Sequence, residues 1–198
     1  MQYTDDIVVS RIYGHGRGWV FTPSHFFDLG SHFAVRKALE RLTNQGTIRR
    51  LSPGFYDYPR RHPSLGDLVP NYEQIGKAFA GQHKLRLQPS GAYAANLLGL
   101  SEQVPAKIIF LTDGSNRELT IGNQRIIFKR TTPKNMAAAG RISGLVIQAL
   151  RHLGKDHVDD DIINRLKARL NDDDKQQLLK DISCAPAWIG AIFRRMVK

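Results

Sequence analysis

Residues 31–58, SHFAVRKALERLTNQGTIRRLSPGFYDY, join a helical pattern to a hairpin pattern, and this combination constrains the fold most strongly. At about 100° per residue, four apolar side chains fall on one side of the predicted helix and must face a core. They are Val35, Ala38, Leu39 and Leu42. The next residues predict two strands, 47–51 and 55–58, around the turn Ser52-Pro53-Gly54. A helix followed by a hairpin predicts a recognition helix and its wing.

The residues before this segment complete the pattern of a winged helix-turn-helix. Thr4 is expected to cap a first helix, which the glycines at 14, 16 and 18 end. Residues 19–21 predict a short strand, and Thr22-Pro23 opens a short second helix that stops at Gly30. Ser31 is expected to cap the third helix, which runs to about residue 45. We therefore predict a winged helix-turn-helix DNA-binding domain over residues 1–58.

The polar side of the third helix and the first wing strand carry the predicted DNA-binding residues. The N-terminal turn of a recognition helix usually meets base edges, and Arg or Lys side chains reach guanines or phosphates. Because side chains alternate along a strand, only one of Arg49 and Arg50 can point at the DNA backbone. The alternative is a solvated basic face without a partner. The predicted set is Ser31, His32, Phe33, Arg36, Lys37, Arg41, Arg49 and Arg50.

Phe33 is unusual in this set, because it is an aromatic residue on the polar side of the helix. Two interpretations remain open. Its ring can pack on thymine methyl groups or deoxyribose in a DNA groove, or it can fold back against Phe26 or Phe27.

The charge of the chain favours an anionic partner. Its 198 residues carry 29 Lys and Arg against 18 Asp and Glu, a formal net charge of +11. Nucleic acid is the commonest partner of such a basic protein. The excess is spread over the chain, at +4, +4 and +3 for residues 1–62, 63–136 and 137–198. A second anionic contact outside the first domain is therefore expected, and Arg117, Arg125, Lys129 and Arg130 are its candidates. The alternative is that these are ordinary exposed strand residues.

Composition argues against several other classes of protein. The single cysteine, Cys184, cannot form an internal disulfide or a cysteine-based zinc site, and its apolar surroundings predict a buried, inert thiol. The N-terminal residues lack the apolar core of a signal peptide, and no apolar run is long enough to span a membrane. A cytoplasmic protein without a membrane partner is expected.

The remainder of the chain predicts a linker and a second domain. Residues 59–71 are rich in proline and arginine and are expected to form the linker. Residues 72–198 predict a mixed α/β domain with strands at 107–112, 118–121 and 125–130, followed by a helical tail. The expected fold class is therefore α/β (α+β), with a small antiparallel sheet in the second domain and a hairpin turn at 113–116.

No arrangement of residues predicts catalysis. The seven histidines form no HxxxH or HExxH metal pattern, and the alternating glycines at 14–18 lack the strand and long helix of a dinucleotide site. The acidic runs 159–161 and 172–174 are better explained as helix N-termini, where negative charge favours the helix dipole. We expect no enzyme activity, no catalytic residues, no metal and no cofactor.

Two segments resemble the AbiEi-type antitoxins of type IV toxin–antitoxin systems, found in bacteria and on mobile elements. GRGWVFTPSHFFDLGSHFAVRKALERLTNQGTIRRLSPGFY is similar to their N-terminal winged helix. LQPSGAYAANLLGLSEQVPAKIIFLTDGSNRELTIGNQRIIFKR is similar to the start of their C-terminal antitoxin domain. The resemblance is clear over residues 16–130 and looser in the helical tail.

The resemblance implies a two-part function. The winged helix would bind double-stranded DNA at inverted repeats in the promoter of its own operon and repress it. The C-terminal domain would counteract a nucleotidyltransferase-like toxin, without requiring a stable complex with that toxin. The alternative is a stand-alone winged-helix repressor whose C-terminal domain binds an effector or dimerises.

Overall fold

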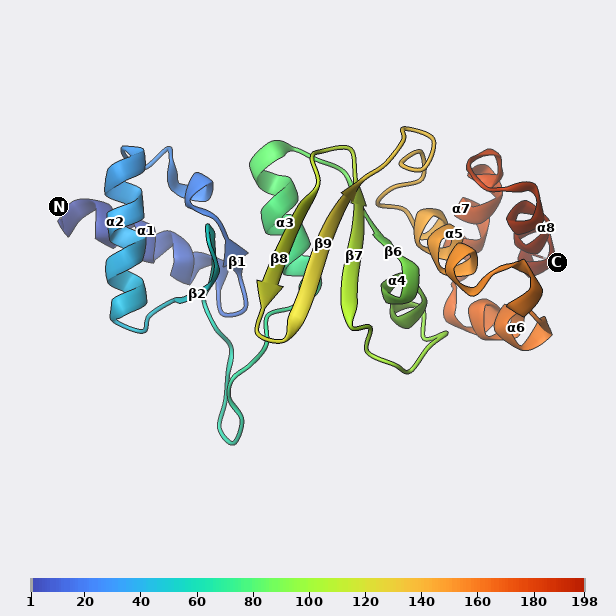
Figure 1. Ribbon diagram of the computed structural model, residues 1–198, viewed down its shortest axis with the longest axis horizontal. Helices are drawn as coiled ribbons and strands as arrows, with labels where there is room; N and C mark the ends of the chain where they lie inside the picture. Colours follow the sequence, from blue (N-terminus) through green and yellow to red (C-terminus); the bar gives the residue numbers. More distant parts are fainter. Residues whose placement is uncertain (1, 198) are drawn as a thin grey trace. The chain divides into compact units, whose positions relative to one another are not determined.

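The computed structural model describes residues 2–197. The chain forms two compact units, which divide between Leu85 and Arg86 (Figure 1). The fold is mixed α/β, with small sheets and a C-terminal helical tail. In the described part of the chain, no helix combines the length and apolar character that crossing a membrane requires.

The first unit begins with the predicted winged helix-turn-helix. Its elements are α1 (Gln2–His15), β1 (Val20–Phe21), the 3₁₀ turn η1 (Pro23–Phe26), α2 (His32–Asn44), β2 (Arg49–Ser52) and β3 (Phe55–Asp57). The strands form an antiparallel sheet in the order β1-β3-β2. Two details differ from the expectation: α1 begins at Gln2, ahead of Thr4, and the second helix is a single 3₁₀ turn.

Helix α2 follows the predicted pattern closely. The hydroxyl of Ser31 accepts a hydrogen bond from the backbone N–H of Ala34 at 3.2 Å, which caps the first turn. The helix ends before Gly46, whose positive φ of 69° suits the reversal into β2. Its apolar stripe is buried, including Leu39 at 0% and Leu42 at 4% exposure, so the prediction of both as core residues is confirmed.

The core of the winged helix joins this stripe to α1 and to the small sheet. Its fully buried members include Val8 and Ile12 of α1, Phe21 of β1 and Phe26 of η1. Arg11 of α1 also donates to the backbone carbonyl of His25 at 2.6 Å and to both carboxylate oxygens of Asp28 at 2.7 Å. These contacts hold the turn that precedes α2, so this helix starts from a defined position.

The chain divides at a different point from the one expected. The segment predicted as a linker, 59–71, contains a second hairpin, β4 (Arg61–His62) and β5 (Gly66–Asp67). Helix α3 (Tyr72–His83), expected to open the second domain, packs against β1 in the first unit. Pro59 and Pro70 flank this exposed hairpin and Pro63 lies in its turn, while the division of the chain lies after Leu85.

The second unit opens with a four-stranded sheet and one short helix. They are β6 (Leu87–Ser90), α4 (Gly91–Leu97), β7 (Lys107–Thr112), β8 (Arg117–Ile121) and β9 (Gln124–Arg130). The strand order is β6-β7-β9-β8, in which β7 and β9 are parallel and the other two pairings are antiparallel. Helix α4 covers the face of β7 that carries Phe110, whose ring lies 5.5 Å from that of Tyr93.

The expected hairpin between β7 and β8 is wrong, because β9 lies between these two strands. The burial of the strands gives the physical reason. On the face that they share, Ile126 and Phe128 of β9 are fully buried, as suits a central strand, whereas Leu119 and Ile121 of β8 keep 5% and 8% exposure, as suits an edge.

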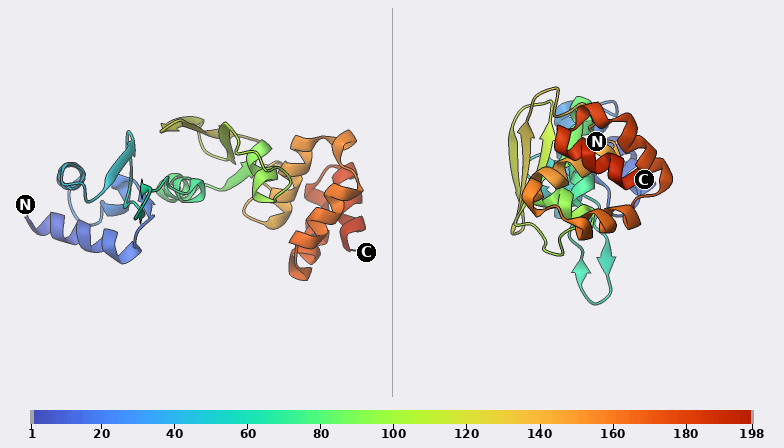
Figure 2. Two further views of the ribbon diagram at one scale, coloured as in Figure 1. Left: turned by 90° about the horizontal axis from the view of Figure 1, so that it is seen from below. Right: turned by 90° about the vertical axis from the view of Figure 1, so that its right-hand side faces the viewer.

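The helical tail completes the second unit (Figure 2). It consists of α5 (Ile142–Leu153), η2 (Lys155–His157), α6 (Asp160–Arg169), α7 (Asp172–Lys180), η3 (Ile182–Cys184) and α8 (Ala187–Val197). The acidic runs lie at helix starts as predicted: Asp159 caps α6 at 2.9 Å and Asn171 caps α7 at 2.8 Å. Cys184 is a free thiol that is only partly buried.

Candidate nucleic-acid interface

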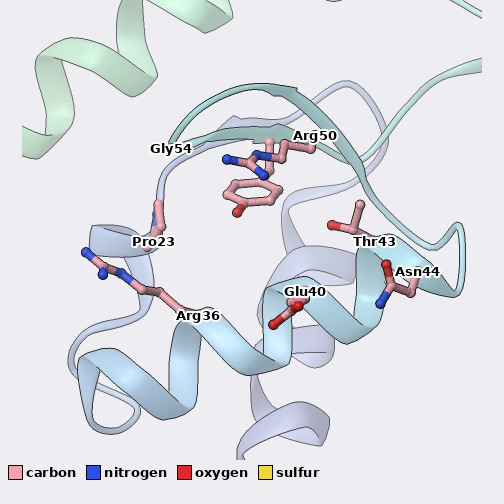
Figure 3. A pocket seen from close by; sticks show the side chains of 8 residues that line it. Pro23, Arg36, Glu40, Thr43, Asn44, Arg50 and Gly54 are labelled. Atoms are coloured by element: carbon pink, nitrogen blue, oxygen red, sulfur yellow. The ribbon is translucent and has the colours of Figure 1, made fainter.

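A groove lies between α2 and the wing formed by β2 and β3 (Figure 3). Its volume is about 540 Å³, and we call it the α2–wing groove. It is lined by Pro23, Arg36, Glu40, Thr43, Asn44, Arg50, Gly54 and Tyr56. One wall comes from the outward side of α2 and the other from the wing, so the two elements predicted to bind DNA form one concave surface.

The tip of the wing is tight enough to approach another molecule closely. Ser52 pairs directly with Phe55, so the turn contains only Pro53 and Gly54 between the strands. Gly54 has a positive φ of 78°, which a side chain would disfavour. A register shift between Arg50 and Ser52 bends β2 just before this tip.

Arg36 and Arg50 carry the positive charge of the groove. Arg36 comes from α2 and Arg50 from β2, and both are exposed. Among the described residues, neither guanidinium has a carboxylate within salt-bridge distance. Two guanidinium groups from opposite walls are therefore available to an anionic ligand.

Glu40 is the acidic member of the groove, and Lys37 counters its charge. The Lys37 ammonium lies 2.8 Å from the Glu40 carboxylate, one helical turn away. This contact lowers the pKa of Glu40, so the carboxylate stays ionised and paired. Lys37 remains exposed beside Arg36.

Arg41 and Arg49 are engaged within the protein. Arg41 donates to Asp5 of α1, with its Nε 2.7 Å from the carboxylate, and this bond lowers the pKa of Asp5. Arg49 lies 2.7 Å from Asp57 and also donates to the carbonyl of Leu68 at 2.8 Å. Burial raises the pKa of Asp57 even though Arg49 counteracts that shift. Of the two wing arginines, only Arg50 lines the α2–wing groove, as strand alternation predicts.

The first turn of α2 presents an exposed aromatic side chain. The His32 ring stacks on Phe27 with centroids 3.7 Å apart, while Phe26 is buried in the core. Phe33 remains 67% exposed. The interpretation that Phe33 folds back against Phe26 or Phe27 is therefore wrong for this structure.

The turn before α2 is held by His25. Its Nδ1 atom accepts a hydrogen bond from the backbone N–H of Thr22 at 3.2 Å. The ring packs edge-on against Trp19, with centroids 5.7 Å apart. Burial lowers the pKa of His25, and the positive charges of His15 and Arg11 act in the same direction.

The four basic residues predicted as a second anionic contact do not form one patch. Arg117 pairs in register with Phe128 and therefore shares its face of the sheet, as does Arg130. Arg125 and Lys129 alternate with Phe128 and lie on the opposite face. Arg125 is also paired with Glu118 at 2.6 Å, which leaves no concentrated positive surface from these four residues.

Comparison with known proteins identifies a family. The sequence matches a protein family over residues 7–178, and that family is described as a family of unknown function, DUF6088. The chain belongs to the DUF6088 family. No curated protein matches the sequence.

A solved structure resembles this DUF6088 protein distantly. The crystal structure of the RV2827C protein from Mycobacterium tuberculosis aligns with a TM-score of 0.44 and 14% sequence identity. The alignment covers 90% of this chain and 71% of that chain. At this level of similarity, no site residue can be transferred from one protein to the other.

Several groove residues of this DUF6088 protein escaped the sequence analysis. Tyr56 lines the groove from β3, and its ring lies parallel to that of Phe21. The strand pattern held a partial signal for Tyr56, because a strand that buries Phe55 must place Tyr56 on its other face, whereas the burial of Asp57 became evident only in the structure. Pro23 gave no such signal, because its place in the groove depends on how η1 packs beside α2.

Proposed function

We propose that the first unit binds double-stranded DNA at inverted repeats in the promoter of the protein's own operon and represses transcription. One observation carries this proposal: Arg36 and Arg50 line the same groove from α2 and from the wing, and no acidic side chain among the described residues lies within salt-bridge distance of either one. The protein acts here by binding in the cytoplasm and not by catalysis.

The chemistry of DNA explains why this surface suits it. The major groove admits an α-helix, and arginine binds guanine edges in a bidentate manner. A second arginine on a wing neutralises a backbone phosphate and releases counterions. In α2 and its wing, Arg36 supplies the first kind of contact and Arg50 the second. Lys37 offsets the negative charge of Glu40 beside them.

The test is promoter binding by the full chain, measured by fluorescence anisotropy at several salt concentrations. Arg36→Ala is expected to weaken binding by roughly 1–3 kcal/mol and to relax sequence preference. Arg50→Ala is expected to weaken binding to all DNA sequences alike. It should also reduce the slope of log affinity against log salt concentration by about one. Arg194→Ala, at an exposed arginine of α8, is the matched control and should bind like the parent protein. Unchanged binding by both groove variants would refute the proposal.

We further propose that the protein is the antitoxin of a type IV toxin–antitoxin system, with antitoxin activity in the second unit. Support comes from the resemblance of both units to AbiEi-type antitoxins. The second unit has a hydrophobic core of its own, around Leu150, Leu166 and Phe193. Its functional partner would be a nucleotidyltransferase-like toxin, which need not be bound stably.

Co-expression with the neighbouring toxin reading frame tests this second proposal. The double variant Arg36→Ala, Arg50→Ala in the full chain should leave the promoter derepressed while still restoring growth. Growth restored only by variants that bind the promoter would mean that protection works through repression alone. No restoration by a protein that still represses would favour the stand-alone repressor.

A further inference from the structure

Phe33 is a large apolar side chain that the fold leaves in water. It is 67% exposed and lies in the first turn of α2, between His32 and Ala34. The two aromatic rings that could shield it are occupied, since Phe26 is in the core and Phe27 stacks on His32. Phe33 is exposed although it lies in a regular helical turn, whose start is capped by Ser31.

The position of Phe33 on α2 defines what can reach it. Residues three and four apart on a helix are neighbours, so Phe33 is flanked by Arg36 and Lys37. Helical side chains lean toward the N-terminus of their helix. The ring therefore projects at the end of α2 that a recognition helix directs at base edges, with two cations beside it.

We propose that Phe33 recognises the 5-methyl group of thymine in the major groove. This inference rests on the proposed binding of promoter DNA and names the base chemistry that the first turn of α2 reads. The thymine methyl is the apolar group that the major-groove edge of a base pair presents, and phenylalanine is among the side chains that contact it. Arg36 and Lys37 supply the charge complementarity that brings an anionic, methyl-bearing surface to the ring.

Replacing single thymines by deoxyuridine tests this directly, because the exchange removes only the methyl group and keeps the base pair. In the promoter fragment bound by the full chain, we expect one thymine per inverted repeat to be sensitive. Loss of that methyl group should weaken binding by about fourfold. This follows because burying one methylene-sized group contributes about 0.8 kcal/mol, and a tenfold change in affinity corresponds to about 1.4 kcal/mol. Other thymines should be insensitive.

Protein variants assign the effect to Phe33. Phe33→Ala should bind the thymine fragment several-fold more weakly and should no longer distinguish it from the deoxyuridine fragment. Phe33→Leu should retain part of the discrimination. Tyr13→Ala removes an aromatic side chain of α1 that is 53% exposed, and should retain all of it. Melting temperatures of all three variants check that they are folded.

The outcomes separate this inference from the proposal on which it rests. If the protein binds its promoter but no thymine is sensitive, or if Phe33→Ala keeps the same sensitivity, Phe33 does not read the methyl group and promoter binding stands. If Phe33→Ala weakens both fragments equally, the ring contacts another group, such as deoxyribose, and the inference fails. If the folded parent protein does not bind the promoter, the proposed function itself fails.

Discussion

Arginine occurs on both the outward and the inward sides of α2 and the wing, but its contacts differ between the two sides. Arg36 and Arg50 line the α2–wing groove, and within residues 2–197 no carboxylate pairs with either, whereas Arg41 and Arg49 are bound by Asp5 and Asp57. Arg49 and Arg50 are adjacent in sequence. An arginine of a basic cluster is therefore available to an anion only where the fold brings no carboxylate to it.

The largest expected difference between the two sides concerns the apolar stripe of α2. Leu39 is fully buried, so Leu39→Ala should reduce the free energy of unfolding by about 2–5 kcal/mol. Lys37→Ala, on the exposed side, should change it by less than about 0.5 kcal/mol. Urea unfolding followed by circular dichroism measures both variants. Equal losses would mean that the two faces of α2 have been assigned wrongly.

The two wing arginines should separate stability from DNA binding. Arg49→Ala leaves Asp57 buried without its partner and should cost about 1–3 kcal/mol of folding stability. Arg50→Ala should leave the melting temperature nearly unchanged and weaken promoter binding instead. Thermal unfolding and anisotropy on the same samples compare the variants. Two outcomes would contradict this assignment. One is that Arg50→Ala is less stable than Arg49→Ala. The other is that folded Arg49→Ala loses specific promoter binding while Arg50→Ala keeps it.

The ion pair of Arg41 with Asp5 should have a smaller effect. Its side chains are 37% and 24% exposed, so solvent screens the pair, and its loss should lower the free energy of unfolding less than the loss of the Arg49–Asp57 pair does. Arg41→Ala should keep most of the DNA affinity that Arg36→Ala loses. A double-mutant cycle with Asp5→Ala measures the coupling. If Arg41→Ala lost as much DNA affinity as Arg36→Ala, Arg41 would have to be assigned to the DNA-binding side of α2.

The smallest expected effect is a pH dependence at the turn before α2. Because burial lowers the pKa of His25, the folded protein binds this proton less readily than the unfolded chain does. Stability is therefore full above about pH 6.5 and is lost as the pH falls below that value. Melting temperatures between pH 7.5 and 5.5 should fall less for His25→Gln than for the parent protein. His152→Gln, at an exposed histidine of α5, should keep the parent dependence.

Local patterns were sufficient to predict α2 and its wing. The spacing of Val35, Ala38, Leu39 and Leu42 predicts which side of α2 is buried. Ser31 and Gly46 predict where the helix begins and ends. These signals act within a few residues, so they can be read without knowing the rest of the fold. The same holds for the acidic residues at the starts of α6 and α7.

Contacts between distant residues were decided only by the tertiary structure. No local pattern shows that β9 inserts between β7 and β8, that α3 packs in the first unit, or that residues 61–67 form a hairpin. The partner of Arg41 lies 36 residues away, at Asp5, and Arg49 also bonds the carbonyl of Leu68. Signals along the chain were enough to place α2 and its wing and to show that their surface is basic. Packing decided which arginines stay free, because a salt bridge depends on where the folded chain brings a carboxylate.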